Sequence, residues 1–150
     1  MRLHRVIGSA AVVAAALLPP AAAADSVYHS EHLRLTPVAG APLRSGFVEN
    51  IKAEGPRVYA HEIFVLNGAG ARTTYTVTRN FFLGETCSGT VFPSDVATLR
   101  TNGSGNARGD VFVRPAEVVG FEGKHGVMWT VRRTPGAVEY ATGCTTVTLD

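Results

Sequence analysis

After residue 24 the chain has no stretch with sustained helical periodicity, and this limits the folds that it can adopt. Almost every apolar stretch is short, rich in Val, Thr, Phe and Tyr, and bounded by Gly, Pro, Asn or Asp. Short runs of β-branched and aromatic residues between turn formers are typical of β-strands. The pattern predicts strands near residues 32–38, 46–53, 58–67, 73–83, 89–92, 96–101, 109–114, 126–133 and 137–149.

The strand predicted at 126–133 shows the clearest alternation. Val127, Trp129 and Val131 share one face of an extended chain, and Thr130 and Arg132 lie on the other. One buried and one solvated face is typical of an antiparallel sheet. The pair Pro135-Gly136 follows at once and suits a tight turn, so the pattern predicts a hairpin with the strand at 137–149.

Two glycine-rich loops, at 67–71 and 102–106, separate strong strand candidates and predict two further hairpins. About eight or nine short strands with regular turn signals favour an all-β fold, an antiparallel β-sandwich. A closed barrel is the alternative.

The segment 137–149 contains a conflict of parity. Its apolar residues fall on opposite faces in two pairs: Val138 with Tyr140, and Val147 with Leu149. One extra residue near Gly143 would bring all four to the core side, which predicts a β-bulge there. If the bulge follows Cys144, that cysteine also points inward and could meet Cys87 between two sheets.

The first 24 residues have the three-part layout of a secretory signal peptide. Arg2 and Arg5 give a basic start, residues 6–18 form a small and apolar run, and an A-x-A site ends at Ala24 before Asp25. The run is shorter than the roughly 20 residues of a membrane-spanning helix. We therefore expect cleavage between Ala24 and Asp25, and a secreted, extracellular protein in which residues 25–150 form one domain. No cysteine follows the cleavage site, so no membrane anchor is expected after cleavage.

Cleavage also changes the net charge. Without Arg2 and Arg5, the 14 basic residues of the chain become 12, which equals the number of acidic residues. A neutral domain lacks the basic surface that binds nucleic acid or anionic lipid, so neither is expected as a partner. The abundance of Ala, Gly and Val and the preference for Arg over Lys indicate a bacterial chain.

The two cysteines of the chain, Cys87 and Cys144, are expected to pair, because thiols of exported proteins meet an oxidising environment. A disulfide closing a loop of about 58 residues would stabilise the fold by about 4 kcal/mol at most in the chain-entropy estimate. A metal site or a catalytic thiol is the alternative, and either would need further ligands or a positioned base.

Two histidines are candidates for chemistry. His61-Glu62 lies in a predicted strand and His125 in a glycine-rich turn, and together they could bind a metal ion or act as acid and base. In the alternative, His61 packs on a partly apolar strand face and His125 lies in solvent. The stretch His29-Ser30-Glu31-His32 could bind zinc or copper, or could be a solvated, partly mobile terminus.

Other catalytic patterns are weaker. The chain lacks the G-x-S-x-G elbow of a serine nucleophile, and Cys87-Ser88-Gly89 lacks the strand–turn–helix context of one. Asp95 and Glu117 could form a glycosidase pair, as many pairs of acids could. Residues 108–110 spell the tripeptide Arg-Gly-Asp near a predicted hairpin, where a turn could present both charges. Phe81-Phe82 puts aromatic rings on both faces of a strand, so one ring is exposed unless a loop crosses the outer face.

Residues 99–110 resemble the strand–turn–strand hairpin of many extracellular immunoglobulin-like β-sandwich modules, and the chain as a whole is similar to small, uncharacterised secreted proteins of actinomycetes. The resemblance implies a sandwich and carries over no functional residue. Together these patterns predict a non-catalytic interaction or structural module without a cofactor or metal site, whose partner is an extracellular protein or carbohydrate. The alternative is a small secreted hydrolase or metal-binding protein using His61 and His125. A ligand carrier would require a closed barrel with an internal apolar cavity.

Overall fold

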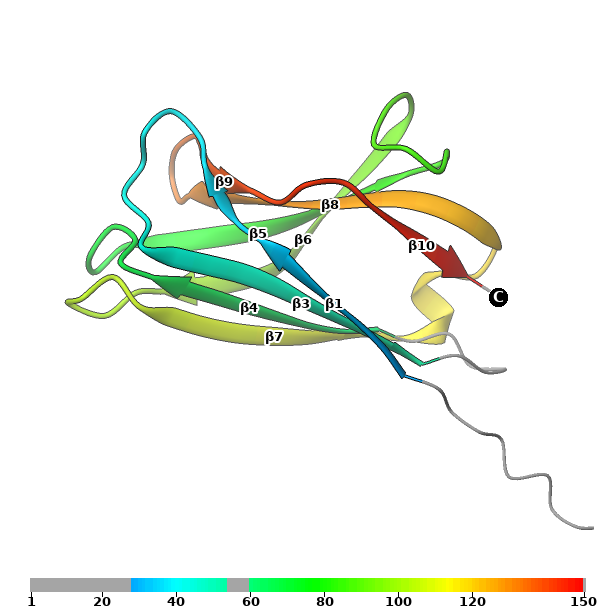
Figure 1. Cartoon of the computed structure of the whole chain (residues 1–150), viewed down its shortest axis with the longest axis horizontal. Helices are drawn as coiled ribbons and strands as arrows, with labels where there is room; N and C mark the ends of the chain where they lie inside the picture. The colour runs from blue at the N-terminus through cyan, green and yellow to red at the C-terminus, as the bar shows by residue number, and fades with distance from the viewer. Residues whose placement is uncertain (1–27, 54–59, 150) are drawn as a thin grey trace, which may run out of the picture.

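Two antiparallel sheets pack face to face in the computed structural model, which describes residues 28–53 and 60–149 (Figure 1). The strands are β1 (Tyr28–Arg34), β2 (Thr36–Pro37), β3 (Ser45–Ala53), β4 (Ala60–Asn67), β5 (Thr74–Phe82), β6 (Val91–Arg100), β7 (Ala107–Val113), β8 (Gly123–Arg133), β9 (Val138–Ala141) and β10 (Thr145–Leu149). A single 3₁₀ turn, η1 (Pro115–Glu117), joins β7 to β8. The predicted β-sandwich is confirmed. The predicted signal peptide lies outside the described residues, within which no helix is long and apolar enough to cross a membrane.

The first sheet has the strand order β1-β3-β4-β7, and the second has the order β2-β9-β8-β5-β6. Strand β10 also pairs with β8, beyond the end of β9. All pairs are antiparallel. Because side chains alternate along a strand, every second residue faces the opposite sheet. Strand β4 shows this clearly, since Glu62, Phe64 and Leu66 are buried and their neighbours are only partly covered.

The hydrophobic core lies between the sheets and includes the alternating residues predicted to share the inner face of β8. Its largest members are Trp129, Tyr75, Tyr140, Phe64, Leu35, Leu66 and Leu99. Two predicted strands, 89–92 and 96–101, form the one strand β6. The predicted strand at 32–38 is divided between β1 and β2, because the chain passes from the first sheet to the second at the buried Leu35.

The hairpin between β8 and β9 is confirmed, whereas the hairpins predicted at the two glycine-rich loops are wrong. The loop at 67–71 joins β4 of the first sheet to β5 of the second, and the loop at 102–106 joins β6 of the second to β7 of the first. Both loops lie at the same end of the sandwich (Figure 1). Turn residues reverse the chain but do not decide whether the next strand pairs with the previous one or crosses to the other sheet.

These two crossing loops contact each other closely. The Ala69 amide donates to the Gly105 carbonyl at 3.0 Å. Gly105 has φ +75°, and a Cβ added to it would lie 2.1 Å from the Ala69 carbonyl oxygen. Both the left-handed backbone and the close approach require glycine at this position.

The bulge predicted near Gly143 is confirmed by the strand register. Thr130 of β8 faces Ala141 and Val127 faces Thr145, so the edge chain contains one more residue than β8 over this length. The shift brings Val147 to the inner face, the same face as the buried Tyr140.

Two details of that prediction are wrong. Val138 is 38% exposed, because a second register shift between Val131 and Arg132 of β8 separates it from Tyr140. Cys144 points to the outer face and is exposed.

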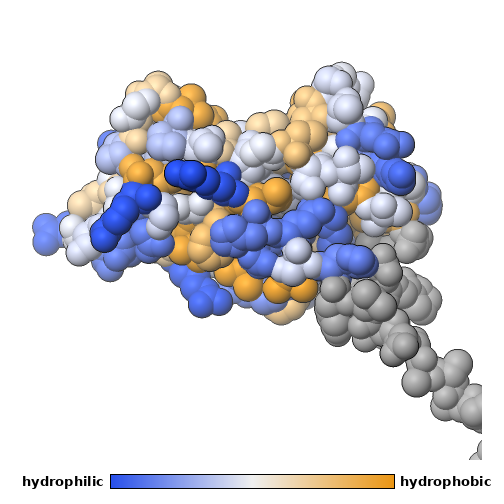
Figure 2. All heavy atoms as spheres, viewed as in Figure 1, coloured by the Kyte–Doolittle hydropathy of each residue, from blue (hydrophilic) through white to orange (hydrophobic). Residues whose placement is uncertain are grey.

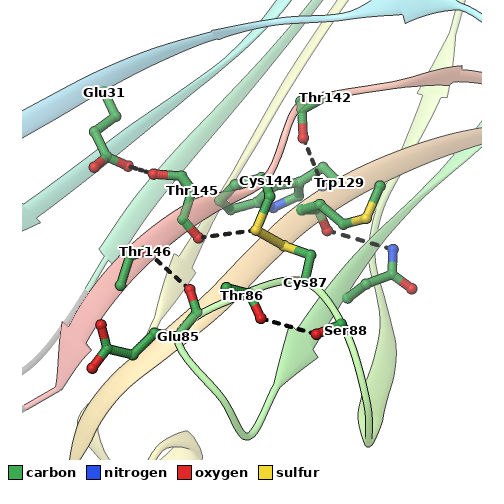
Figure 3. The surroundings of a disulfide bond; sticks show 12 residues. Glu31, Glu85, Thr86, Cys87, Ser88, Trp129, Thr142, Cys144, Thr145 and Thr146 are labelled. Carbon is green, nitrogen blue, oxygen red and sulfur yellow. Dashed lines mark hydrogen bonds between the residues drawn. A yellow bond between two sulfur atoms is a disulfide. The ribbon is translucent and has the colours of Figure 1, made fainter.

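The predicted disulfide between Cys87 and Cys144 is present, with the Cα atoms 5.7 Å apart. It does not lie between the sheets. It joins the loop of residues 83–90, which we call the strap, to the chain between β9 and β10, on the outer side of the second sheet (Figure 3). The strap passes over Gly126 of β8, where an added Cβ would lie 2.6 Å from the carbonyl carbon of Thr86.

The strap also explains the pair Phe81-Phe82. Phe81 faces the inside of the sandwich, whereas Phe82 faces outward and lies opposite Gly126 of the neighbouring strand β8. Phe82 is only 9% exposed, so neither ring is an open surface contact. The expectation that a loop crosses the outer face is confirmed.

Candidate functional site

A cavity of about 400 Å³ lies between the two sheets. It is at the end of the sandwich that carries η1, whose position is shown in Figure 1. We call it the inter-sheet cavity. Strands β3, β4 and β7 contribute residues from the first sheet, and β5, β6, β8 and β10 contribute residues from the second. Residues of η1 and the turn after it line the end, and the cavity is partly open to solvent. Its volume lies in the range of small-molecule sites, and most of its wall is apolar.

A buried charge network forms the inner wall of this cavity. The Glu62 carboxylate, 2% exposed, accepts a hydrogen bond at 2.9 Å from Arg79 Nη1 and another at 3.1 Å from Trp129 Nε1. Glu62 comes from β4 of the first sheet, and its two partners come from β5 and β8 of the second. The network therefore joins the two sheets through the core, and it compensates a carboxylate that would otherwise be costly to bury.

Two further polar side chains line the cavity from β3. Asn50 is 2% exposed, and its Oδ1 has no hydrogen-bond partner. The Lys52 ammonium lies 3.6 Å from Glu31 Oε2. Burial lowers the pKa of Lys52 below its usual 10.5, and the nearby carboxylate only partly opposes this shift. The cavity thus presents a partly desolvated cation beside an unpaired buried amide oxygen.

Aromatic rings form the wall on the side of the second sheet. The Phe121 ring, which follows η1, meets Phe81 of β5 edge-on at 5.2 Å and Phe92 of β6 at 5.9 Å. His125 of β8 lies 4.6 Å from the Phe81 ring, measured between centroids. Edge-to-face contacts of this kind stabilise an aromatic cluster beyond the burial of area alone. Phe92 remains 44% exposed, so this wall reaches the surface at the mouth of the cavity.

Sequence reasoning missed this site. Glu62 has the same parity as Phe64 and Leu66, and Arg79 has the same parity as Tyr75 and Val77, so each charge continues an inward-facing row. An acidic residue in one inward-facing row and a basic residue in the other could have indicated a buried ion pair between the sheets. This signal was obscured in β4, because Ile63 and Val65 are also apolar and leave the inner face ambiguous.

The histidines proposed as a pair do not meet. His61 lies on the outer face of the first sheet, where Nε2 is 3.0 Å from Asp110 Oδ2 and the ring stacks on Phe112 at 4.1 Å. His125 lies on the inner face of β8 and is buried, with Nδ1 3.1 Å from the Leu83 carbonyl oxygen. The expectation of a solvated His125 in a turn is wrong, because β8 begins at Gly123 and includes it.

The stretch 29–32 belongs to β1 and pairs with β3, so it is not a loose terminus. His32 Nδ1 lies 2.9 Å from Glu49 Oε2, and Ser30 donates a hydrogen bond to the same carboxylate. Both contacts lower the pKa of Glu49, the Ser30 hydrogen bond more strongly. Within residues 28–53 and 60–149, no group of three or more His, Cys, Asp or Glu side chains is placed to hold a metal ion.

The remaining candidates are separated by the fold. Asp95 lies on the outer face of the second sheet and pairs with Arg132 at 2.7 Å, whereas Glu117 lies in η1 at the inter-sheet cavity. They therefore do not form a carboxylate pair. The tripeptide 108–110 lies inside strand β7, with the Asp110 carboxylate against His61. The tripeptide therefore does not lie in a turn that presents both of its charged side chains.

Comparisons with known proteins found no protein-family model that matches the chain, and no match among curated proteins or solved structures. The argument for function therefore depends on the geometry of the site.

Proposed function

We propose that the protein is a secreted, non-catalytic β-sandwich that binds a small extracellular molecule in the inter-sheet cavity. The observation that carries the proposal is an apolar cavity of about 400 Å³ whose wall holds the buried, unpartnered Oδ1 of Asn50. Buried polar atoms are rarely left without a partner, so a ligand that supplies a hydrogen-bond donor would relieve this one. Apolar walls with a few placed polar groups are typical of ligand sites.

Secretion is part of the proposal and is supported by the signal-peptide pattern and by the disulfide. Export of the full chain from a bacterial host tests it. We expect the protein recovered from the medium to begin at Asp25, as read by intact mass. Retention in the cytoplasm, or export with residues 1–24 still attached, would contradict this part.

Binding is tested with Nile red, a neutral dye whose emission rises in apolar surroundings. We expect one dye to bind per chain, and the emission of Trp129, the only tryptophan, to change as it does so. Ser94 lines the cavity from β6, so the larger side chain of Ser94→Phe should block the dye. Thr98→Phe is the matched control, because Thr98 lies on the same strand and faces outward beside Thr76.

Equal dye binding by both variants would contradict a site between the sheets. Absence of saturable binding to the unmodified protein would overturn the proposed function itself.

A further inference from the structure

The polar groups of the inter-sheet cavity offer more hydrogen-bond donors than acceptors. Both oxygens of Glu62 are engaged, by Arg79 and Trp129. An arginine carries five N–H donors and a lysine three, and neither can accept. Among the ion pairs of the described residues, Arg79 contacts one carboxylate, that of Glu62. The guanidinium of Arg79 therefore has further N–H donors beyond this bond.

Lys52 adds a second positive charge whose existing partner is already shared. Glu31 Oε2 accepts a hydrogen bond from the Thr145 hydroxyl at 2.9 Å, and the same oxygen lies 3.6 Å from Lys52 Nζ. That separation exceeds a direct hydrogen bond, which for N–H···O is about 2.7–3.2 Å. The ammonium therefore keeps donors for a closer acceptor, and its partial desolvation strengthens any charge-assisted bond that it forms.

The charges of the lining favour an anion over a cation. Glu62 neutralises Arg79 within the wall, whereas Glu31 lies 3.6 Å from Lys52 and compensates it only in part. Lys52 is therefore the positive charge of the lining without a close partner. Glu117 of η1 also lines the cavity, but it is exposed, so water and salt screen its charge. A cationic ligand would place its charge beside Lys52 and would find the inner carboxylate already engaged.

We propose that the inter-sheet cavity takes an amphipathic carboxylate, with its apolar body against Phe81, Phe92 and Phe121 and its carboxylate on Lys52. This proposal rests on the proposed function and names its ligand class. A hydroxyl or N–H group beside the carboxylate would donate to Asn50 Oδ1, which favours hydroxy acids and N-acyl amino acids over plain carboxylic acids.

Four probes with the same chain length separate these contributions: octanoate, octanol, octylamine and 2-hydroxyoctanoate. Binding to the mature protein is followed by calorimetry and by the emission of Trp129, which lines the cavity and donates a hydrogen bond to Glu62. We expect octanoate to bind about tenfold more tightly than octanol, as one charge-assisted hydrogen bond would give. Octylamine should bind more weakly than octanol, and 2-hydroxyoctanoate more tightly than octanoate.

Two variants assign these differences to residues. Lys52→Met keeps an unbranched side chain of nearly the same length without the charge, and it should remove the preference for octanoate over octanol. Lys124→Met is the matched control, because Lys124 is the other lysine of the chain, is exposed on β8 and does not line the cavity. Asn50→Leu should remove the advantage of 2-hydroxyoctanoate over octanoate. Circular dichroism confirms that each variant is folded.

The outcomes distinguish the two proposals. If octanol binds as tightly as octanoate, or if Lys52→Met leaves the preference intact, the carboxylate assignment is wrong while the cavity remains a ligand site. If none of the four probes binds and Nile red also fails, the proposed function fails and this inference falls with it.

Discussion

Replacing Glu62 by Gln tests whether the network between the sheets is the stabilising element that its geometry indicates. The substitution keeps the shape of the side chain and removes the charge that compensates Arg79. Breaking a buried ion pair by removing one partner typically costs about 3–5 kcal/mol. Glu62 is 2% exposed, but the Arg79 side chain is 17% exposed, so water can solvate part of its charge. We therefore expect the lower end of that range, a loss of about 3 kcal/mol.

Urea unfolding of the mature protein, followed by Trp129 emission, measures this loss. With a urea dependence of about 1.5 kcal/mol per molar, a loss of 3 kcal/mol lowers the midpoint by about 2 M. Because the indole of Trp129 donates to Glu62, the emission of the folded Glu62→Gln protein should change as well. That spectral change reports on the contact itself, independently of stability.

A double-mutant cycle separates the ion pair from the loss of packing. Arg79→Met alone leaves a buried carboxylate without its cation and should also destabilise. In the double variant Glu62→Gln/Arg79→Met neither charge remains, and replacing a buried pair by neutral groups is often nearly neutral. We expect the double variant within about 1 kcal/mol of the unmodified protein, and a coupling energy of at least about 2 kcal/mol. Additive losses, or a Glu62→Gln protein as stable as the original, would refute the reasoning.

Further substitutions test the strap and the cavity wall. Replacing both Cys87 and Cys144 by Ser should lower the free energy of unfolding by up to about 4 kcal/mol, since the bond joins residues separated by 57 positions, and urea unfolding checks it. Gly126→Ala should lower it by about 1–3 kcal/mol because a Cβ there meets backbone of the strap, whereas Gly143→Ala, with nothing within 4 Å, should be neutral. Lys52→Met should raise the melting temperature at neutral pH, because burial disfavours the charged form of Lys52. The lowered pKa also means that the unmodified protein gains stability as the pH rises through that pKa toward 10.5, and this gain should vanish in Lys52→Met. Thermal scans across alkaline pH measure both effects, and an unchanged pH dependence would contradict them.

The alternation of apolar residues was sufficient to predict the class of fold, because a half-buried strand requires it. Val127, Trp129 and Val131 lie in the core as their spacing predicts, and the extra residue near Gly143 follows from parity alone. Alternation is a local property and does not specify which strands pair. The loops at 67–71 and 102–106 show this limit, since the same turn residues would serve a hairpin or a crossing between sheets.

The candidate site escaped prediction for a related reason. Glu62 and Arg79 are 17 positions apart in the sequence and in different sheets, so their contact depends on the packing of the sheets. Likewise, the cavity depends on how far apart the two layers lie at one end. By contrast, the histidines were conspicuous by residue type, yet His61 faces outward and His125 packs in the aromatic cluster.

The two ends of the sandwich differ in how their polar groups are satisfied. At the end of the crossing loops, the Tyr75 hydroxyl donates to Glu139 and the Tyr140 hydroxyl donates to the Pro42 carbonyl, each at 2.9 Å. Desolvation raises the pKa of Tyr140, so its hydroxyl keeps this proton throughout the neutral range.

At the opposite end, the amide oxygen of Asn50 has no partner and Lys52 is partly desolvated, and both features reduce stability. Such features persist at sites of function, where the rest of the fold offsets them. The disulfide and the strap lie over the second sheet near this weaker end, where Thr146 of β10 also donates to the Glu85 carbonyl of the strap (Figure 3).

Elsewhere on the surface, hydrophobic residues lie among hydrophilic ones on the face shown in Figure 2 and do not form one continuous patch. This face therefore does not offer a broad apolar docking surface.

An amphipathic carboxylate in the inter-sheet cavity would contact the unsatisfied groups of the weaker end directly, so binding should raise the melting temperature of the unmodified protein. In Lys52→Met, which is expected to be more stable without ligand, the same concentration of octanoate should raise it less. An equal increase in both proteins would show that the ligand acts elsewhere.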